Sequence, residues 1–292
     1  MRMPDTLIPP SLMVVVLGML ASLGWGTADF GGGLSSRSAP VLGVLGGSQF
    51  ASLFVAVPIL LLGSEPAMAT SDLAIAVAGG LLGALGLALL YRGLAIGRMG
   101  VVAPVAAVLT ATLPVLYGFV TDGVPSIFAV AGIGLAVGSV VLVSRAPRAD
   151  GDDRPSGLGY ALAAGTTFGL FTISASFLGD GLVMAPVVAI RITSVLAIAA
   201  FLLLRRGAWR VPRRLWPALF GVGVIDMAAT ASYLGAISVG PLAIAAILAS
   251  LYPVVTTVLA TVVLRERVTR GHVIGIVAAG AAVVLIAGAG AT

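Results

Sequence analysis

Residues 186–204 read PVVAIRITSVLAIAAFLLL, an apolar stretch that a single charged side chain, Arg191, interrupts. A membrane-spanning helix needs about 20 mostly apolar residues, and this stretch has that length. A charge at the centre of such a helix costs about 2.5–3.5 kcal/mol on insertion scales, so we expect Arg191 to face protein or water and not lipid. The stretch therefore predicts a membrane helix with a structural or functional charge in its middle.

The composition of the whole chain is typical of a membrane protein. Of its 292 residues, 59% are hydrophobic and 9% are charged, and the mean hydropathy is +1.15. These values lie outside the range of soluble domains. The chain has no cysteine and one histidine, His272, so we expect no disulfides, no metal site and no cofactor.

The apolar stretches predict an all-α polytopic membrane protein with ten transmembrane helices. The expected spans are 12–34, 41–63, 73–96, 100–120, 126–144, 157–178, 183–204, 215–238, 241–264 and 271–290. The connections are short, except for RAPRADGDDRPS at 145–156, which we interpret as a cytoplasmic linker at the midpoint of the chain.

Arginine accounts for all of the basic side chains, and its distribution indicates the topology. The chain contains no lysine, and most of its arginines lie in connections that follow odd-numbered spans, while connections after even-numbered spans have none. By the positive-inside rule the arginine-rich connections are cytoplasmic, which predicts that both termini lie outside. This pattern sets membrane topology and does not indicate nucleic-acid binding.

The two halves of the chain resemble each other at an offset of about 142 residues. LYRGLAIG at 90–97 aligns with SYLGAISV at 232–239, which pairs Tyr91 with Tyr233. Chance similarity between apolar helices is the alternative, because any two such runs look alike. The shared tyrosine and glycine positions and the reversed arginine bias favour a true repeat.

This repeat predicts the organisation of the chain. The first five-helix repeat is 1–144, the linker is 145–156, and the second repeat is 157–292. Because five is an odd number of spans, the second copy must enter the membrane upside down. Inverted repeats of this kind build secondary transporters, whose substrate site lies near the midplane between the halves.

Three motifs resemble the EamA-type transporters of the drug/metabolite transporter superfamily. They are WGTADFGGGLSSR at 25–37, GRMGVVAPVAAVL at 97–109 and SLYPVVTTVLATVVLRERVT at 250–269. TDGVPS at 121–126 departs from the family pattern, because the family commonly has a glutamate–arginine pair there. The resemblance implies a bacterial inner-membrane carrier, often an exporter of amino acids or other small metabolites, with a cavity that opens alternately to each side.

Arg191 and Asp226 are the candidate centre of the site. At about 1.5 Å per residue, Arg191 lies about 12 Å from the outer end of its helix and Asp226 about 16 Å from the inner end of the next. Both are therefore expected near the midplane, as an ion pair. Two interpretations stay open: a pair that fixes helix packing, or an arginine that binds a carboxylate or phosphate of the substrate while Asp226 competes for it or carries a proton. Gln49 is the repeat-mate of Arg191.

Two further charges lie within the spans. Asp29 and Arg92 are expected at similar depth near the cytoplasmic face, where they could form an inner gate latch; snorkelling at a helix end is the alternative. Among the aromatic residues, Trp25, Tyr91 and Tyr233 are candidates for the substrate cavity, although packing or interfacial anchoring would also explain them.

The function that these observations favour is a secondary transporter of a small polar or zwitterionic metabolite, amino-acid-like, with export as the expected direction. Its partners would be the metabolite, the lipid bilayer and, as a candidate coupling ion, the proton. A passive facilitator or channel is the alternative. A membrane-embedded lipid-modifying enzyme is disfavoured, because it needs a nucleophile, a base or a metal cluster that the sequence does not supply.

Overall fold

The structure is a computed structural model that describes residues 10–122, 127–128, 130–132, 134–135, 138–139, 155–179, 181–239, 245, 248–249, 251–265 and 270–289. These residues form helices and their connections, and none of them lies in a strand. The helices are α1 (Pro10–Ser35), α2 (Val41–Leu62), α3 (Thr70–Ile96), α4 (Met99–Asp122), α6 (Leu158–Ala175), α7 (Met184–Arg205), the 3₁₀ turn η1 (Arg213–Leu215), α8 (Trp216–Val239), α10 (Tyr252–Leu264) and α11 (Arg270–Ala289).

Six of these helices are long and apolar enough to cross a membrane: α1, α2, α3, α6, α7 and α8, the last together with η1. Leucines at the ends of α2 and α7 point away from the protein; Leu62 is 88% exposed and Leu204 is 83% exposed. An apolar side chain is stable in that position when its surroundings are lipid. The chain is therefore a multi-pass membrane protein. The expected fifth span at 126–144 and the linker at 145–156 lie largely outside the described residues.

The expected ninth span, 241–264, differs from the structure at one point. Leu251 forms a turn, and α10 begins at Tyr252, with Pro253 in its first helical turn. Proline lacks a backbone N–H and clashes with the preceding turn of a helix, but it is well tolerated at a helix start. The turn at Leu251 therefore lies within the expected span, whose first part, 241–244, 246–247 and 250, is outside the described residues.

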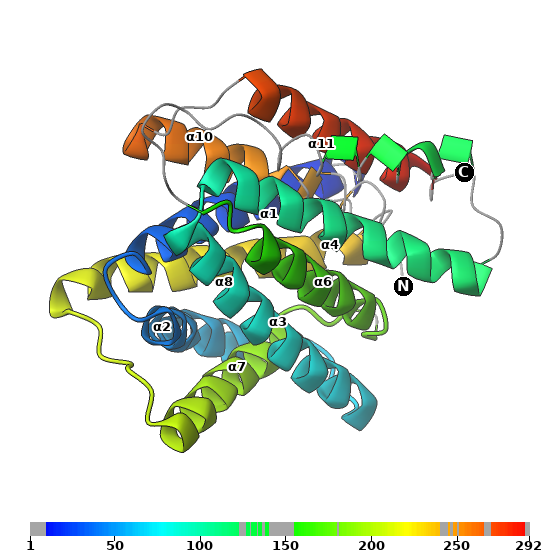
Figure 1. Cartoon of the computed structure of the whole chain (residues 1–292). Helices are drawn as coiled ribbons and strands as arrows, with labels where there is room; N and C mark the ends of the chain where they lie inside the picture. The colour runs from blue at the N-terminus through cyan, green and yellow to red at the C-terminus, as the bar shows by residue number, and fades with distance from the viewer. Residues whose placement is uncertain are drawn as a thin grey trace.

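The two halves of the chain pack against each other through several helix pairs (Figure 1). α1 packs against α8 and α10, α3 packs against α6 and α7, and α2 lies beside α7 and α8. Glycines allow the closest approaches: a Cβ at Gly223 of α8 would collide with the backbone of Ser48 in α2, and one at Gly80 of α3 would lie 2.9 Å from the carbonyl oxygen of Ile190 in α7. Small residues at such crossings let membrane helices approach backbone to backbone.

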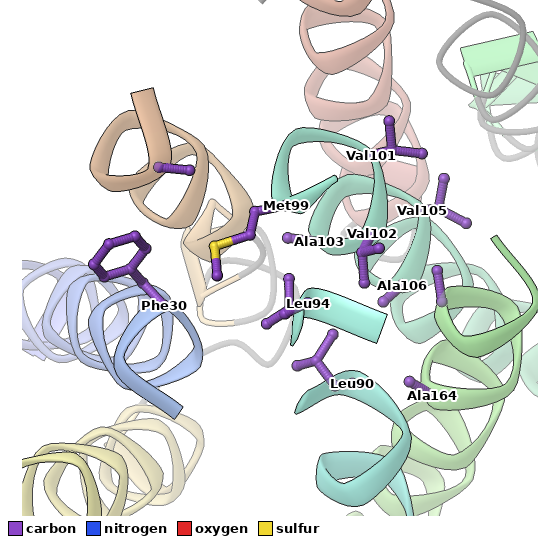
Figure 2. Close-up of a cluster of buried hydrophobic side chains, with 12 residues drawn as sticks. Phe30, Leu90, Leu94, Met99, Val101, Val102, Ala103, Val105, Ala106 and Ala164 are labelled. Carbon is purple, nitrogen blue, oxygen red and sulfur yellow. The ribbon is translucent and has the colours of Figure 1, made fainter. Parts of the chain in front are cut away.

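Several apolar clusters form the core of the described part of the chain, and three of them lie around the candidate site. Figure 2 shows one of them, in which Leu90 and Leu94 of α3 lie among Phe30, Met99 and residues of α4 and α6. A second contains Tyr91 with residues of α1, α2, α7 and α8, and we call it the Tyr91 cluster. A third contains Tyr233 with Ala56, Val187 and their neighbours, and we call it the Tyr233 cluster.

Candidate functional site

Arg191 forms a buried ion pair with Asp226. The Nη1 of Arg191, in the middle of α7, lies 2.6 Å from Oδ2 of Asp226 on α8. Only 3% of Arg191 and 5% of Asp226 are exposed. The expected contact between these two residues is confirmed, and so is the expectation that Arg191 faces protein.

Two neutral side chains complete the surroundings of the guanidinium group. Nη1 of Arg191 donates to Oε1 of Gln49 at 2.6 Å, and Nη2 donates to Oγ1 of Thr230 at 2.9 Å and to the carbonyl oxygen of Asp226 at 3.3 Å. Nε2 of Gln49 lies 3.5 Å from Oδ2 of Asp226, at the limit of a hydrogen bond. The Nε of Arg191 is buried and has no partner. We call Arg191, Asp226, Gln49 and Thr230 the central network.

The aromatic residues Trp25 and Tyr233 lie against the central network. The indole N–H of Trp25 on α1 donates to Oγ1 of Thr230 at 3.4 Å. Its ring centroid is 5.3 Å from that of Tyr233, with the two planes at 46°. Tilted pairs at this separation are favourable contacts between aromatic rings. Trp25 therefore brings the first half of the chain into contact with the Tyr233 cluster.

Tyr91 occupies a different place from its repeat-mate. It is 1% exposed and belongs to the Tyr91 cluster, where its ring lies directly against Gly32 of α1. Tyr233 belongs to the other cluster and stacks on Trp25. Of the six expected site residues, the structure brings Arg191, Asp226, Gln49, Trp25 and Tyr233 into one contiguous group. Tyr91 packs in the neighbouring core.

The ion pair of the hypothesised inner gate latch, between Asp29 and Arg92, is not formed in this structure. Asp29 is 5% exposed, whereas Arg92 is an exposed residue. Successive residues of a helix point about 100° apart, so Arg92 cannot share the direction of Tyr91, which faces α1. Its exposed position near the end of α3 agrees with the snorkelling alternative.

The packing of α1 against α8 sets the level of Asp29 relative to Asp226. On α1, Gly24 contacts Ile225 and Ala229 of α8, and Gly31 contacts Val222. Asp29 falls between these two contacts and therefore lies at the level of the α8 segment that carries Asp226.

Two residues at one end of the bundle were missed by the sequence reasoning. The Glu65 carboxylate, in the connection between α2 and α3, accepts hydrogen bonds from the backbone N–H groups of Val183, Met184 and Ala185 at 3.3, 2.6 and 2.9 Å. Oδ1 of Asp72 accepts one from Gly179 at 3.0 Å. Free N–H groups and the helix dipole favour an anion at the start of α7. We call these contacts the Glu65 clamp.

At the other end of the bundle, the connection after α7 approaches the start of α2. A Cβ at Gly43 would collide with the carbonyl oxygen of Trp209, so only glycine permits this approach. The signals for both contacts were in the sequence: an acidic residue in a short connection without arginine, and a glycine in the first turn of a helix. Neither signal identifies its partner, because the partner lies in the other half of the chain.

No group of three or more His, Cys, Asp or Glu side chains that could hold a metal ion occurs among the residues that the structure describes. The chemistry of the central network is therefore that of an arginine, a carboxylate, an amide and a hydroxyl. Such a set can bind an anionic or a polar group, and it can rearrange by exchanging hydrogen bonds.

The comparisons with known proteins identify the class. Residues 155–288 match the model of the EamA-like transporter family, which belongs to the drug/metabolite transporter superfamily. Residues 155–288 are thus similar to an EamA-like transporter domain, and the expected resemblance is confirmed over these residues. Members of this family are transporters and not enzymes. No curated protein matches the chain.

A solved structure titled only "Crystal structure of protein" has a similar fold. It covers 92% of this chain and 95% of its own, with 18% sequence identity and a TM-score of 0.64. At this identity, the similarity concerns the fold alone.

Proposed function

We propose that this protein is a secondary transporter that moves a small polar or zwitterionic, amino-acid-like metabolite across the bacterial inner membrane by alternating access, in the direction of export. The observation that carries the proposal is the buried central network, where an arginine lies between helices of the two halves. A charged group that is expensive to bury is common in a membrane protein where a substrate passes.

The position of the network supports a transport site. Gln49 and Trp25 come from the first half of the chain, and Arg191, Asp226 and Thr230 come from the second. Any motion of one half against the other changes these contacts. A network with members from both halves can therefore respond to substrate and to conformation together.

The contacts between the halves support the proposed inverted repeat. Arg191 bonds to Gln49, its repeat-mate, 142 residues away. The glycine contacts come in matched pairs: Gly26 packs on Val255, and Gly169 packs on Leu113. The two glycines are 143 residues apart and the two partners are 142 apart. In each pair, a glycine of one half contacts the other half at the position that corresponds to its counterpart's contact. This reciprocity is expected when two copies of one unit face each other across an approximate two-fold axis.

The two ends of the bundle supply candidate gates. The Glu65 clamp joins the connection after α2 to the start of α7, and Trp209 in the connection after α7 meets Gly43 at the start of α2. Under the proposed repeat, these two contacts join equivalent segments of the two halves, at opposite ends of the bundle. By the arginine bias, the Glu65 clamp is the outer gate and the Trp209 contact the inner one. Both are closed in this structure, which we interpret as an occluded conformation.

The chemistry of the network suggests how a substrate would bind. Arg191 makes a charge-assisted pair with Asp226, and a substrate carboxylate would compete for the same guanidinium group. Gln49 and Thr230 would provide neutral hydrogen bonds, and Trp25 and Tyr233 an aromatic wall. The roles of Tyr91 in substrate binding and of Asp29 and Arg92 in gating stay predictions.

Counterflow in proteoliposomes tests the proposal. Vesicles that contain the purified protein and an unlabelled amino acid are placed in a trace of the same radiolabelled compound, over a panel of amino acids. We expect transient accumulation of at least one compound by the wild type, and its loss in Arg191→Gln. Arg205→Gln is the matched control, because Arg205 is an exposed residue at the end of the same helix.

The possible results separate the alternatives. Loss of counterflow in Arg191→Gln but not in Arg205→Gln supports a substrate-binding arginine. Equal counterflow in all three proteins would assign Arg191 to packing alone. Flux without counterflow would contradict the carrier and favour a passive facilitator, because only a saturable carrier exchanges labelled for unlabelled substrate.

A further inference from the structure

A second buried acid lies next to the central network but takes no part in it. Asp29 is 5% exposed. Among the residues that the structure describes, its carboxyl group has no hydrogen-bond or ion-pair partner. Asp226, at the same level, is neutralised by Arg191 and bonded to Gln49. The two acids are thus similarly buried, but Asp226 has a positively charged partner and Asp29 does not.

The direction of Asp29 follows from its neighbours on α1. Trp25, four residues before it, points to Thr230 of the central network, and Gly32, three residues after it, lies against the ring of Tyr91. Residues at these spacings share one face of a helix. Asp29 therefore faces the interior of the bundle, between the network and the Tyr91 cluster.

Among the residues that the structure describes, the groups that act electrostatically on Asp29 include no positive charge. Of the elements packed against this part of α1, α8 presents Asp226, α3 presents Tyr91 and α10 presents Tyr252, all within electrostatic range of Asp29. α2 contributes the neutral Gln49. The hydroxyl of Tyr252 is itself buried and lies near Thr110. The guanidinium group of Arg191 is already bonded to Asp226, Gln49 and Thr230.

We propose that Asp29 is the proton-binding site of the transporter and that it holds a proton in this conformation. An ionised carboxylate without a partner is very costly in a dry interior, and a carboxyl group avoids that cost by staying neutral. When the interior opens to water, hydration stabilises the carboxylate and the proton leaves. Opening and proton release are thereby linked at one residue.

The infrared spectrum tests proton binding directly. A protonated carboxyl group has a C=O stretching band that a carboxylate lacks. We expect this band in the purified wild-type protein at neutral pH, and its loss in Asp29→Asn. Asp72→Asn is the control, because Asp72 accepts backbone hydrogen bonds at the end of the bundle and is only half-buried there. Absence of the band in the wild type, or its persistence in Asp29→Asn, would overturn the proposal.

A second variant, Asp29→Glu, distinguishes loss of proton binding from loss of folding. Asp29→Glu keeps a carboxyl group in the site, so the band should remain at a shifted frequency. Asn is close in shape to a protonated aspartic acid, and we therefore expect Asp29→Asn to unfold at nearly the same temperature as the wild type. Strong destabilisation of Asp29→Asn together with loss of the Asp29→Glu band would show that Asp29 is ionised and structural.

The coupling step alone rests on the proposed transport function. In proteoliposomes with a pH gradient, Asp29→Asn should retain counterflow and lose accumulation driven by the gradient. If no compound shows counterflow in the wild type, the proposed function fails, while the infrared result on proton binding still stands. If Asp29→Asn keeps gradient-driven accumulation, the coupling role of Asp29 is refuted.

Discussion

At the scale of single residues, the central network shows how the protein accommodates a charge in an apolar interior. Arg191 alone would be too costly to bury. Asp226 supplies the opposite charge at 2.6 Å, and Gln49 and Thr230 satisfy other donors of the guanidinium group. The Nε of Arg191 remains without a partner. The hydrogen-bonding groups of the network therefore have partners, with the exception of the Nε of Arg191.

We predict that removing one member of the ion pair is worse than removing both. Asp226→Asn leaves Arg191 charged and without its counter-ion, and such a loss typically costs about 3–5 kcal/mol. The double variant Arg191→Gln/Asp226→Asn leaves neutral side chains and should recover much of that loss. Thermal unfolding in detergent, arranged as a double-mutant cycle, measures this. Additive losses would mean that the two charges do not depend on each other.

The sequence allowed the ion pair to be predicted but not the residues around it. Arg191 and Asp226 are conspicuous because charges are rare in apolar spans, and their depths follow from helical rise. Thr230 gave no such signal, because a threonine in a membrane helix commonly bonds to its own backbone, as Thr230 also does to Asp226. The Asp29–Arg92 contact is absent from this structure, and depth alone could not predict this, because depth does not fix the direction of a side chain.

At the scale of helices, glycine positions decide how closely the two halves approach. Gly223 of α8 lies against the backbone of Ser48, whereas Gly221 of the same helix has open space where its Cβ would be. The sequence showed many glycines but not which of them lie at crossings. That information depends on the partner helix, which lies far away in the chain.

These two glycines form a matched experiment. Gly223→Ala should force α8 away from α2 and destabilise the fold by about 1–3 kcal/mol, the usual cost of overpacking. Gly221→Ala should be neutral or slightly stabilising, since alanine favours the helix. Unfolding temperatures of the two variants provide the comparison. Equal temperatures would show that the α2–α8 crossing adjusts freely.

At the scale of the whole molecule, the two halves of the chain meet at both ends of the bundle. The Glu65 clamp uses a carboxylate on the free N–H groups of α7, and the opposite end uses a backbone approach at Gly43. The helical class and many span boundaries were predictable from apolar length. The end contacts were not, because they depend on how the halves pack.

We predict that weakening the Glu65 clamp opens that end of the bundle. The chain has no cysteine, so a single cysteine at Val187, a fully buried residue of the Tyr233 cluster, can report access. Val187→Cys should react slowly with a membrane-impermeant thiol reagent and several times faster when combined with Glu65→Ala. Leu219→Cys lies in the Tyr91 cluster, and Glu65→Ala should not increase its rate of reaction with a reagent added from the same side. Equal rates for Val187→Cys with and without Glu65 would exclude a gating role.

The hydrogen bond between Arg191 and Gln49 has a consequence for the history of the protein. If the two halves descend from one duplicated gene, the ancestor was a pair of identical chains, and these two positions held the same amino acid facing its own copy. Two arginines at this distance would repel each other, and two glutamines would carry no charge to attract an anion. On that line of descent, a lone cation between the two halves became possible only after the copies were fused and free to diverge.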